Sequence, residues 1–341
     1  MRLLVTGAAG HVAREVVRQV LAAGDTVVAP YRDAPGEDDT PQASGLVWVR
    51  CDLADPDAVA RLADEHAVDA CIHAAAVSNE AYARPQPLAA IHSNVGATAN
   101  LLDAARRHGW RRFILLSTGS VFQQLADTRR PILEDALPSP VDIYATTKHC
   151  AEQLTRMYRT LFELEAATIR ISWVYGPPVV SDSPARGPIP MFLRRALAGI
   201  PLREPSGADA AASYTYVGDV AAGLLAACRA PALNHALYHL GCGVNFTAGE
   251  VADAVRAAVP GAVIELGPGS EPWTTYTAPR GPLAGARFAD DTGFVLTPSA
   301  LAAGVGAYAD WMRANPASYL EPPPANGLLR APSAVGAQAA W

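Results

Sequence analysis

Strands and helices alternate through the first half of this chain, and no other feature constrains the fold as strongly. Short apolar runs rich in β-branched residues predict strands at 3–5, 26–29, 46–49, 70–73, 113–117 and 167–171. The segments between them follow the helical period and predict helices at 11–23, 56–65, 87–108 and 143–162. Strict alternation is typical of a parallel sheet with helices on both faces, so we expect an α/β fold with a Rossmann-type, doubly wound sheet.

The alternation lapses after Tyr175-Gly176-Pro177-Pro178, where the sequence becomes rich in proline and glycine. Only short elements are expected beyond this point, at 190–198, 214–217, 236–240 and 248–258. We therefore expect a cofactor-binding domain at 1–175 and a smaller, discontinuous substrate lobe at 176–320, with segments that return to the sheet. Residues 321–341 are expected to form a proline-rich tail without a core of its own.

Charge balance and cysteine usage limit the partners and the compartment. The 341 residues carry a net charge of −6 with no block of like charge, which disfavours nucleic acid and anionic membranes and favours a small-molecule substrate. No apolar run is long enough to span a membrane. The five cysteines and eight histidines show no metal-ligand spacing, and an odd number of scattered cysteines is typical of reduced thiols. We expect a cytoplasmic protein without a metal site.

The first predicted strand runs into a glycine-containing turn, Thr6-Gly7-Ala8-Ala9-Gly10-His11-Val12-Ala13. In a doubly wound sheet this turn binds phosphate, because the N–H groups at the start of the helix and the helix dipole point at the anion. Alanine is accepted at the third small position of the motif, so Ala13 is compatible with it. A plain strand-to-helix connection is the alternative. The cofactor contacts expected here are Gly7, Ala9, Gly10, His11 and Val12.

A tyrosine and a lysine lie four residues apart in a predicted helix. Lys148 is the only lysine among the 27 lysine and arginine residues, and it follows Tyr144 at the spacing that puts both side chains on one helical face. A compact ammonium is not interchangeable with a guanidinium. The neighbouring charge is expected to lower the pKa of the phenol, so that Tyr144 can exchange a proton with a substrate hydroxyl. An exposed helix pair without a catalytic role is the alternative.

Hydroxyl groups follow the fifth predicted strand in Ser117-Thr118-Gly119-Ser120. They lie at the carboxyl end of that strand, which is the edge where such sheets bind ligands. We expect a hydroxyl of this stretch, with Thr118 and Ser120 as candidates, to hold a substrate oxygen.

Together these motifs resemble the extended short-chain dehydrogenase/reductase superfamily, in particular its NAD-dependent epimerases and dehydratases. The likeness runs from residue 1 to 313 and is strongest at 6–13, 117–122, 144–148 and 175–177. The resemblance implies that Thr118 orients the substrate oxygen, Tyr144 transfers the proton, and Lys148 holds the nicotinamide ribose and tunes Tyr144. It further implies that Asp52 and Leu53 contact the adenine, that Asn94 has a structural role, and that the cofactor-binding set also includes Ala74, Ala75 and Ala76.

Two departures from the family pattern bear on the reaction and the cofactor. Family dehydratases carry an Asp-Glu pair directly after the catalytic threonine, whereas this chain has Gly119 and Ser120, which disfavours dehydration. The second strand ends in Pro30-Tyr31-Arg32 instead of an aspartate, and an arginine suits the 2′-phosphate of NADP. A solvated surface arginine is the alternative for Arg32. The expected cofactor is therefore NADP or NAD, with a lean to NADP.

A third departure bears on the substrate. Nucleotide-sugar enzymes of the family often place a diphosphate-binding arginine just before the strand that matches 214–217, and here the residues are Ala210-Ala211-Ala212-Ser213. Arg280 stands where the family often has its second diphosphate arginine. Because one cation compensates a buried diphosphate poorly, the sequence favours a smaller polyol, sugar or sugar acid, with Arg280 available for a carboxylate. A nucleotide sugar is the alternative.

We therefore expect an NAD(P)-dependent dehydrogenase, reductase or epimerase that moves a hydride at a secondary alcohol or ketone of a sugar-like molecule. A nucleotide-sugar epimerase with retained cofactor is one alternative. A non-catalytic redox sensor is another, and the presence of Tyr144 and Lys148 argues against it. The resemblance also implies a homodimer joined through the helices near 87–108 and 143–162.

Overall fold

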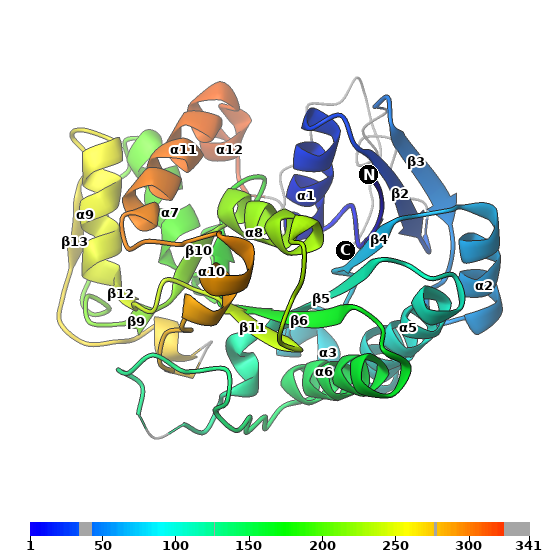
Figure 1. Ribbon diagram of the computed structural model, residues 1–341. Coiled ribbons are helices and arrows are strands. Elements are labelled where there is room, and N and C mark those ends of the chain that lie inside the picture. Colours follow the sequence, from blue (N-terminus) through cyan, green and yellow to red (C-terminus); the bar gives the residue numbers. More distant parts are fainter. Residues whose placement is uncertain (34–42, 126, 276–277, 324–341) are drawn as a thin grey trace.

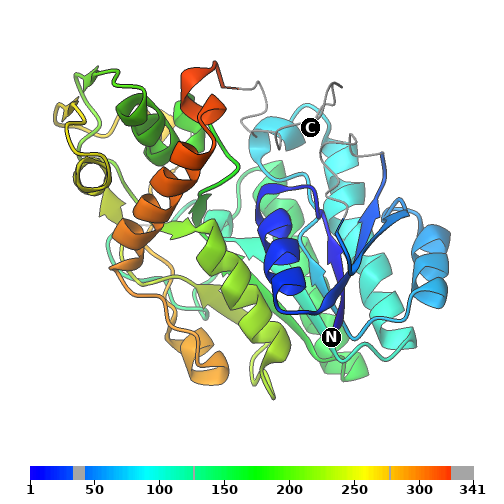
Figure 2. The same ribbon diagram turned by 90° about the horizontal axis from the view of Figure 1, so that it is seen from above.

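The computed structural model describes residues 1–33, 43–125, 127–275 and 278–323 (Figure 1). Only residues 321–323 of the expected proline-rich tail are among these, so that prediction otherwise lies outside the described residues. A large sheet covered by helices forms one side of the molecule, and a smaller lobe of helices and short strands forms the other (Figures 1 and 2).

The large sheet has seven strands, and every neighbouring pair in it is parallel. Across the sheet the order is β11 (Leu237–Leu240), β6 (Ala166–Ile171), β5 (Arg112–Thr118), β4 (Ala70–His73), β1 (Arg2–Thr6), β2 (Thr26–Tyr31) and β3 (Leu46–Arg50). The strand order reverses at β1, and such a switch point leaves a crevice for ligands at the carboxyl ends of the strands. The expected Rossmann-type, doubly wound sheet is confirmed.

Helices cover both faces of the sheet. On one face α1 (His11–Ala22) packs against α8 (Val217–Arg229), and the other face carries α2 (Pro56–Glu65), α5 (Ala97–Arg107) and α6 (Ile143–Phe162). Alternate residues of each strand supply the two cores, so that Leu3 packs with α1 and α8 while Leu4 packs with α2 and α5. Because both faces of the sheet are buried, the strands appear in the sequence as continuous apolar runs.

Capping residues determine where two of these helices begin. Asp55 precedes α2 and accepts a hydrogen bond from the N–H of Asp57, with Pro56 at the first helical position. Asp142 precedes α6 and accepts from the N–H of Ala145 at 2.7 Å. Both boundaries match the sequence prediction.

The helix predicted at 87–108 contains a π-helical turn. It consists of α4 (Pro87–Ile91), the π-helical segment His92–Gly96 and α5. The backbone stays helical through both junctions, since Ile91 and Ala97 have right-handed helical φ and ψ angles. Such turns occur frequently at functional sites, and this one contains Asn94.

The smaller lobe is built from helices around three two-stranded sheets. The sheets pair β7 (Trp173–Tyr175) with β10 (Tyr214–Tyr216), β8 (Leu202–Glu204) with β13 (Ile264–Leu266), and β9 (Ala211–Ala212) with β12 (Phe246–Thr247). The helices are α7 (Pro188–Leu197), α9 (Ala248–Ala258), α11 (Ala300–Ala314) and α12 (Ala317–Leu320). Outside this lobe lie the short helices α3 (Glu80–Ala83) and α10 (Ala286–Thr292).

The expectation of only short, scattered elements after 176 is wrong for two long helices. Helix α8 spans Val217–Arg229 and α11 spans Ala300–Ala314, and the predicted strand at 214–217 ends one residue early because α8 begins at Val217. Helix α8 is rich in alanine and apolar around most of its circumference, so it shows no clear helical period in the sequence. It has this composition because it packs against α1, the large sheet and the short strands β7 and β10. In α11 the buried residues Leu301, Val305, Tyr308 and Met312 do follow the helical period, and the prediction missed them.

None of the helices in the described ranges is long and apolar enough to cross a membrane. The five cysteines, all of which lie in those ranges, are free.

Candidate active site

The turn between β1 and α1 is in close backbone contact with the segment that follows β4. Gly7 has a φ of +69°, and a Cβ there would lie 2.9 Å from the backbone N and Cα of Ala75, so only glycine fits. The Thr6 hydroxyl accepts hydrogen bonds from the N–H groups of Ala74 and Ala75, at 3.1 and 3.0 Å. Gly10, the N-cap of α1, has no side chain that could cap the helix, so the first N–H groups can bind an anion. These features fit the pyrophosphate of a dinucleotide.

His11 joins this turn to the segment that follows β7. Its Nε2 donates a hydrogen bond to the carbonyl of Gly176 at 3.0 Å. Burial lowers the pKa of His11 to about 4, so the imidazole is neutral. Ala9 and Val12 flank the same turn, and Val12 packs against the core beneath α1. The side chain of His11 therefore binds the protein backbone, which the sequence did not indicate.

The remaining predicted adenosine contacts lie at the ends of β2 and β3. Arg32 follows β2 and forms an exposed ion pair with Asp33, with 2.8 Å between Nε and Oδ2. Asp52 follows β3, and its Oδ1 accepts from the N–H of Ala54 at 3.0 Å. The carbonyl of Leu53 accepts from Asn100 at 2.9 Å. These residues stand at the same edge of the sheet as the turn.

Asn94 holds the segment that follows β4, in which Ala74, Ala75 and Ala76 are half-buried. Its Oδ1 accepts from the N–H of Val77 at 2.7 Å, and its Nδ2 donates to the Thr147 hydroxyl at 2.9 Å. Because Thr147 directly precedes Lys148, Asn94 connects the end of β4 to the middle of α6.

Tyr144 lies in the first turn of α6, where the Glu80 carboxylate accepts its backbone N–H at 3.1 Å. Burial raises the pKa of the phenol to about 12, while a hydrogen bond with Thr118 and the charge of Arg280 act in the opposite direction. The expected lowering of this pKa is therefore wrong for the protein without cofactor, because burial outweighs the neighbouring positive charge. The cation that acts most on the phenol is Arg280 and not Lys148.

Lys148 is 3% exposed and shares one face of α6 with Tyr144 and Glu152, at intervals of four residues. Burial lowers its pKa to about 8, and the charge of Glu152 acts against this shift. The ammonium is therefore still protonated at neutral pH, and it offers three N–H donors to a ligand.

A buried ionic network anchors α6 to the sheet below Lys148. Glu152 accepts hydrogen bonds from the Ser117 hydroxyl at 2.6 Å and from Arg170 at 2.8 and 2.7 Å. Arg170 also donates to His239 Nε2 at 3.4 Å, and His239 Nδ1 donates to the carbonyl of Ile132 at 3.0 Å. Burial acts to raise the pKa of Glu152, but hydrogen bonds from Arg170, His149 and Ser117 and the charge of Arg170 hold it at about 2. The network fixes α6 next to the strand end that carries Thr118.

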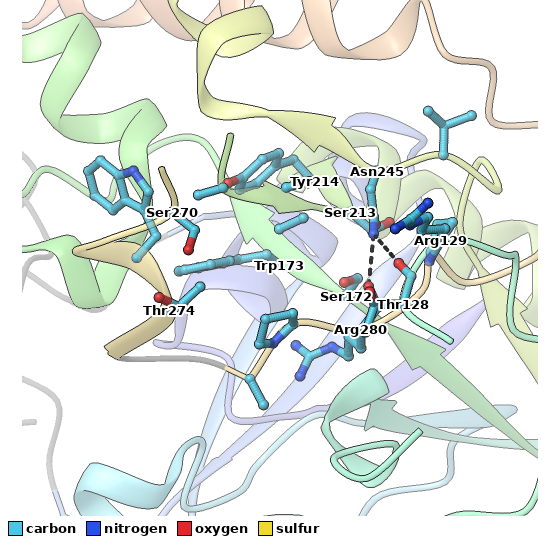
Figure 3. A pocket seen from close by; sticks show the side chains of 18 of the residues that line it. Thr128, Arg129, Ser172, Trp173, Ser213, Tyr214, Asn245, Ser270, Thr274 and Arg280 are labelled. Atoms are coloured by element: carbon cyan, nitrogen blue, oxygen red, sulfur yellow. Dashed lines mark hydrogen bonds between the residues drawn. The ribbon is translucent and has the colours of Figure 1, made fainter. Parts of the chain in front are cut away.

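A cavity of about 470 Å³ lies against the smaller lobe (Figure 3). Its volume is within the range of small-molecule pockets, roughly 300–1,000 Å³. Trp173 and Tyr214 form an aromatic wall with ring centroids 5.7 Å apart. The described lining includes Arg280 but not Thr118, Ser120, Tyr144 or Lys148. Arg280, whose charge acts on the phenol, therefore connects the cavity with Tyr144.

Comparison with known proteins decides the family. The model of the NAD dependent epimerase/dehydratase family matches residues 3–241, which is more than half of the chain. The chain belongs to this family.

Relatives and solved structures agree with the assignment. The chain is 27% identical over 252 residues to the UDP-glucuronate 4-epimerase of Thermodesulfobacterium geofontis, which covers 71% of this chain and 75% of the relative. It is 30% identical over 264 residues to the UDP-glucose 4-epimerase of Mycolicibacterium smegmatis, which covers 76% and 83%. The structure of the Thermus thermophilus UDP-glucose 4-epimerase complex with NAD matches with a TM-score of 0.75 at 27% identity, covering 92% of this chain and 99% of that one.

As a member of the epimerase/dehydratase family, the protein is an NAD-dependent enzyme of the extended short-chain dehydrogenase/reductase superfamily. The resemblance inferred from the sequence motifs is thereby confirmed, and the alternative of a non-catalytic sensor is not retained. The roles of Thr118, Tyr144 and Lys148 as a catalytic set stay predictions, now with a geometry that brings the three side chains to one place.

The structure adds residues that the sequence reasoning missed. Glu152 was visible as a carboxylate four positions after Lys148, on the same predicted helical face. Glu80 supports the start of α6 from a four-residue helix that has no recognisable pattern. Arg129, Trp173 and Asn245 line the cavity from three separate segments, and none stands in a motif that single-sequence reasoning recognises.

Proposed function

We propose that the protein is an NAD-dependent epimerase of a nucleoside-diphosphate sugar, which inverts a secondary alcohol of the sugar. The observation that carries this proposal is the position of Arg280, which lines the 470 Å³ cavity and acts electrostatically on the Tyr144 phenol. An anionic ligand held by Arg280 would therefore lie next to the predicted proton-transfer residue. The similarity to UDP-glucose and UDP-glucuronate 4-epimerases supports a UDP-sugar.

Different residues would bind different parts of the cofactor. The β1–α1 turn with Gly7 and Gly10 would hold the pyrophosphate, and Lys148 would bind the hydroxyls of the nicotinamide ribose. When bound, NAD supplies the acceptor for a hydride. The charge of Arg280, together with those of Lys148 and the bound cofactor, would favour the phenolate form of Tyr144.

The chemistry assigned to the side chains is proton transfer. Thr118 would hydrogen-bond the reacting oxygen, and the Tyr144 phenolate would take the hydroxyl proton in the oxidising half of the reaction. In the reducing half Tyr144 would return that proton to the carbonyl oxygen, with the bound cofactor supplying the hydride chemistry of both halves. The carbon is then inverted with no net oxidation.

We propose NAD over NADP within this cofactor class. Arg32, which suggested NADP, forms an ion pair with Asp33, and a carboxylate at that position would repel a 2′-phosphate. The preference for NADP stays a prediction. Titration of the protein with NAD and NADP decides between them: tighter binding of NADP, reduced by Arg32→Ala, would favour the sequence-based expectation.

We also retain the two-lobe division and the homodimer as proposals. Residues 1–175 would bind mainly the cofactor and 176–320 mainly the substrate. Exposed apolar side chains support a dimer through α4 and α6, which contact each other: Leu88, Ile91, Met157 and Leu161 are between 40% and 70% exposed. The oligomeric states of the wild type and of Leu161→Glu, measured by sedimentation, would test this contact.

The test of the proposed function is direct. UDP-glucose and UDP-glucuronate are incubated with the protein and NAD, and nuclear magnetic resonance of the products detects the C4 epimers. Thermal shifts with UDP, GDP and dTDP extend the test to other nucleotides, because a specific ligand raises apparent stability. If none of these ligands produces a shift and no epimer forms, while a free sugar or sugar acid is oxidised, the small-substrate alternative replaces this proposal.

A further inference from the structure

The cavity has two chemically different ends (Figure 3). Ser270 and Thr274 lie at one end, where the Asp209 carboxylate accepts from the N–H of Gly269 at 2.7 Å. Thr128, Arg129 and Asn245 form the other end, and Trp173 lies between the two. The Arg280 side chain starts beside Thr128 and extends below Trp173. One end therefore offers neutral and acidic groups, and the rest of the lining carries two guanidinium groups.

The two arginines come from loops that run side by side. Asn245 Nδ2 donates to the carbonyl of Arg280 at 2.8 Å and to that of Thr128, the residue before Arg129, at 3.4 Å. A Cβ on Gly281 would collide with the carbonyl of Arg130, so the loops are in backbone contact. Ile132 and Leu283 then pair as an isolated parallel bridge. Positions 129 and 280 are thus held as neighbours although 150 residues of chain separate them in the sequence.

The described carboxylate of the loop that carries Arg129 does not pair with the Arg129 guanidinium. The Asp127 carboxylate accepts from the backbone N–H groups of Arg129 and Arg130, at 2.9 and 3.2 Å, and pairs with the Arg130 side chain at 3.4 Å. Within the described residues, the Arg129 guanidinium forms no ion pair. The Arg130 side chain is 89% exposed and does not belong to the described lining of the cavity.

We propose that Arg129 and Arg280 together bind the diphosphate of the substrate. Arg129 would supply the second cation that residues 210–213 lack, and this assignment rests on the proposed function. Two guanidinium groups compensate a diphosphate much better than one, because charges removed from water need both pairing and hydrogen bonds. A smaller substrate was expected because residues 210–213 leave Arg280 as one cation for a diphosphate, and Arg129 supplies a second. The nucleoside would then extend past Trp173 toward Ser270.

Arg129→Gln and Arg130→Gln form a matched pair for the test, because they remove the same charge from adjacent positions of one loop. Calorimetric titration of the NAD-loaded protein uses UDP, GDP and dTDP and the corresponding nucleosides as probes. For the diphosphate that the wild type binds, Arg129→Gln should weaken binding by about tenfold, the usual order of effect for one charge-assisted contact. Binding of the nucleoside should be unchanged, and Arg129→Lys should restore part of the loss. Arg130→Gln should bind both probes as the wild type does.

The outcomes separate the two proposals. If the wild type binds a nucleoside diphosphate and Arg129→Gln binds it equally well, the assignment of Arg129 is overturned and the proposed function stands. An equal loss in Arg129→Gln and Arg130→Gln also overturns it, because the effect would then be the general charge of the loop. If the wild type binds none of the three diphosphates, both proposals are overturned.

Discussion

The cofactor edge of the large sheet and the neighbouring cavity are assembled in opposite ways. At the cofactor edge the turn residues are consecutive, and Gly7 meets Ala75 because β1 and β4 are paired strands. At the cavity the walls come from segments far apart in the chain, and Asn245 holds together the loops that carry Arg129 and Arg280. The first region can be recognised from local sequence, whereas the second exists only in the folded protein.

This difference has a consequence for variants. Substitutions at the cofactor edge and in α6 act on backbone contacts, buried charges or the transferable proton, so we expect large effects on stability, cofactor affinity or turnover. Substitutions at the cavity act on side chains joined by single hydrogen bonds, so we expect smaller effects confined to the substrate. The following variants test this contrast.

Tyr144→Phe should have the largest effect. It removes the phenol hydroxyl, with its transferable proton and its hydrogen bond to Thr118, so turnover should fall by roughly 10²- to 10⁴-fold, the range for a general acid–base group. Thermal stability and cofactor affinity should stay close to those of the wild type. Tyr158→Phe, on the half-buried part of the same helix, is the control and should keep its activity. Turnover of Tyr144→Phe within a few-fold of the wild type would refute the proton-transfer role.

Glu152→Gln should destabilise the protein strongly, because it leaves the buried Arg170 without its charge partner. Breaking a buried pair costs about 3–5 kcal/mol of the free energy of unfolding. The pKa of Glu152, held at about 2, lies below its usual value, so its contribution is present above the usual value and disappears as the pH falls through about 2.

The control for Glu152→Gln is Glu265→Gln, which breaks an ion pair with Arg203 in which both side chains are more than half exposed. Exposed pairs contribute little, so the control should unfold like the wild type. Denaturant unfolding between pH 2 and pH 7 measures both variants. Equal stability of the two would mean that the network does not anchor α6.

Gly7→Ala tests the backbone contact at the cofactor edge. Its matched control is Gly24→Ala, because both glycines have a positive φ, +69° and +77°, but a Cβ on Gly24 would meet nothing within 4 Å. Gly24→Ala should cost about 1 kcal/mol from backbone conformation alone. Gly7→Ala should cost more, and it alone should weaken NAD binding. Identical losses in unfolding and NAD titration would show that the close approach to Ala75 is unimportant.

Asn245→Ala should have the smallest effect and should be confined to the substrate. It removes the side chain that joins the two loops, so KM should rise by a few-fold, about the worth of one neutral hydrogen bond, with kcat and NAD affinity unchanged. Asn234→Ala, at an exposed asparagine that pairs with Asp291, is the control and should leave KM unchanged. A fall in NAD affinity in Asn245→Ala would contradict the separation of the two regions.

Local signals were enough for much of the fold and for the cofactor side. The helix starts at residues 56 and 143 were predicted correctly, and the apolar runs predicted the first six strands of the sheet within a few residues. Helix α8 could not be predicted, because side chains buried on most sides leave no period to detect. Helix α11 does show a helical period, with Leu301, Val305, Tyr308 and Met312 on its buried face, and the prediction missed it. The pKa of Tyr144 also could not be predicted, because a sequence shows the nearby charge but not the burial.

The sequence by itself determined the doubly wound sheet, the phosphate-type turn and the helical face shared by Tyr144 and Lys148, since each depends on residues within a few positions of one another. Only the tertiary structure decided that Arg280 stands beside Tyr144, that Arg129 joins it at the cavity, and that Glu152 ties α6 to Arg170. These contacts depend on how loops and strands meet after folding. The physical reason is that hydrogen bonds and charges act over a few ångströms in space, whatever the separation along the chain.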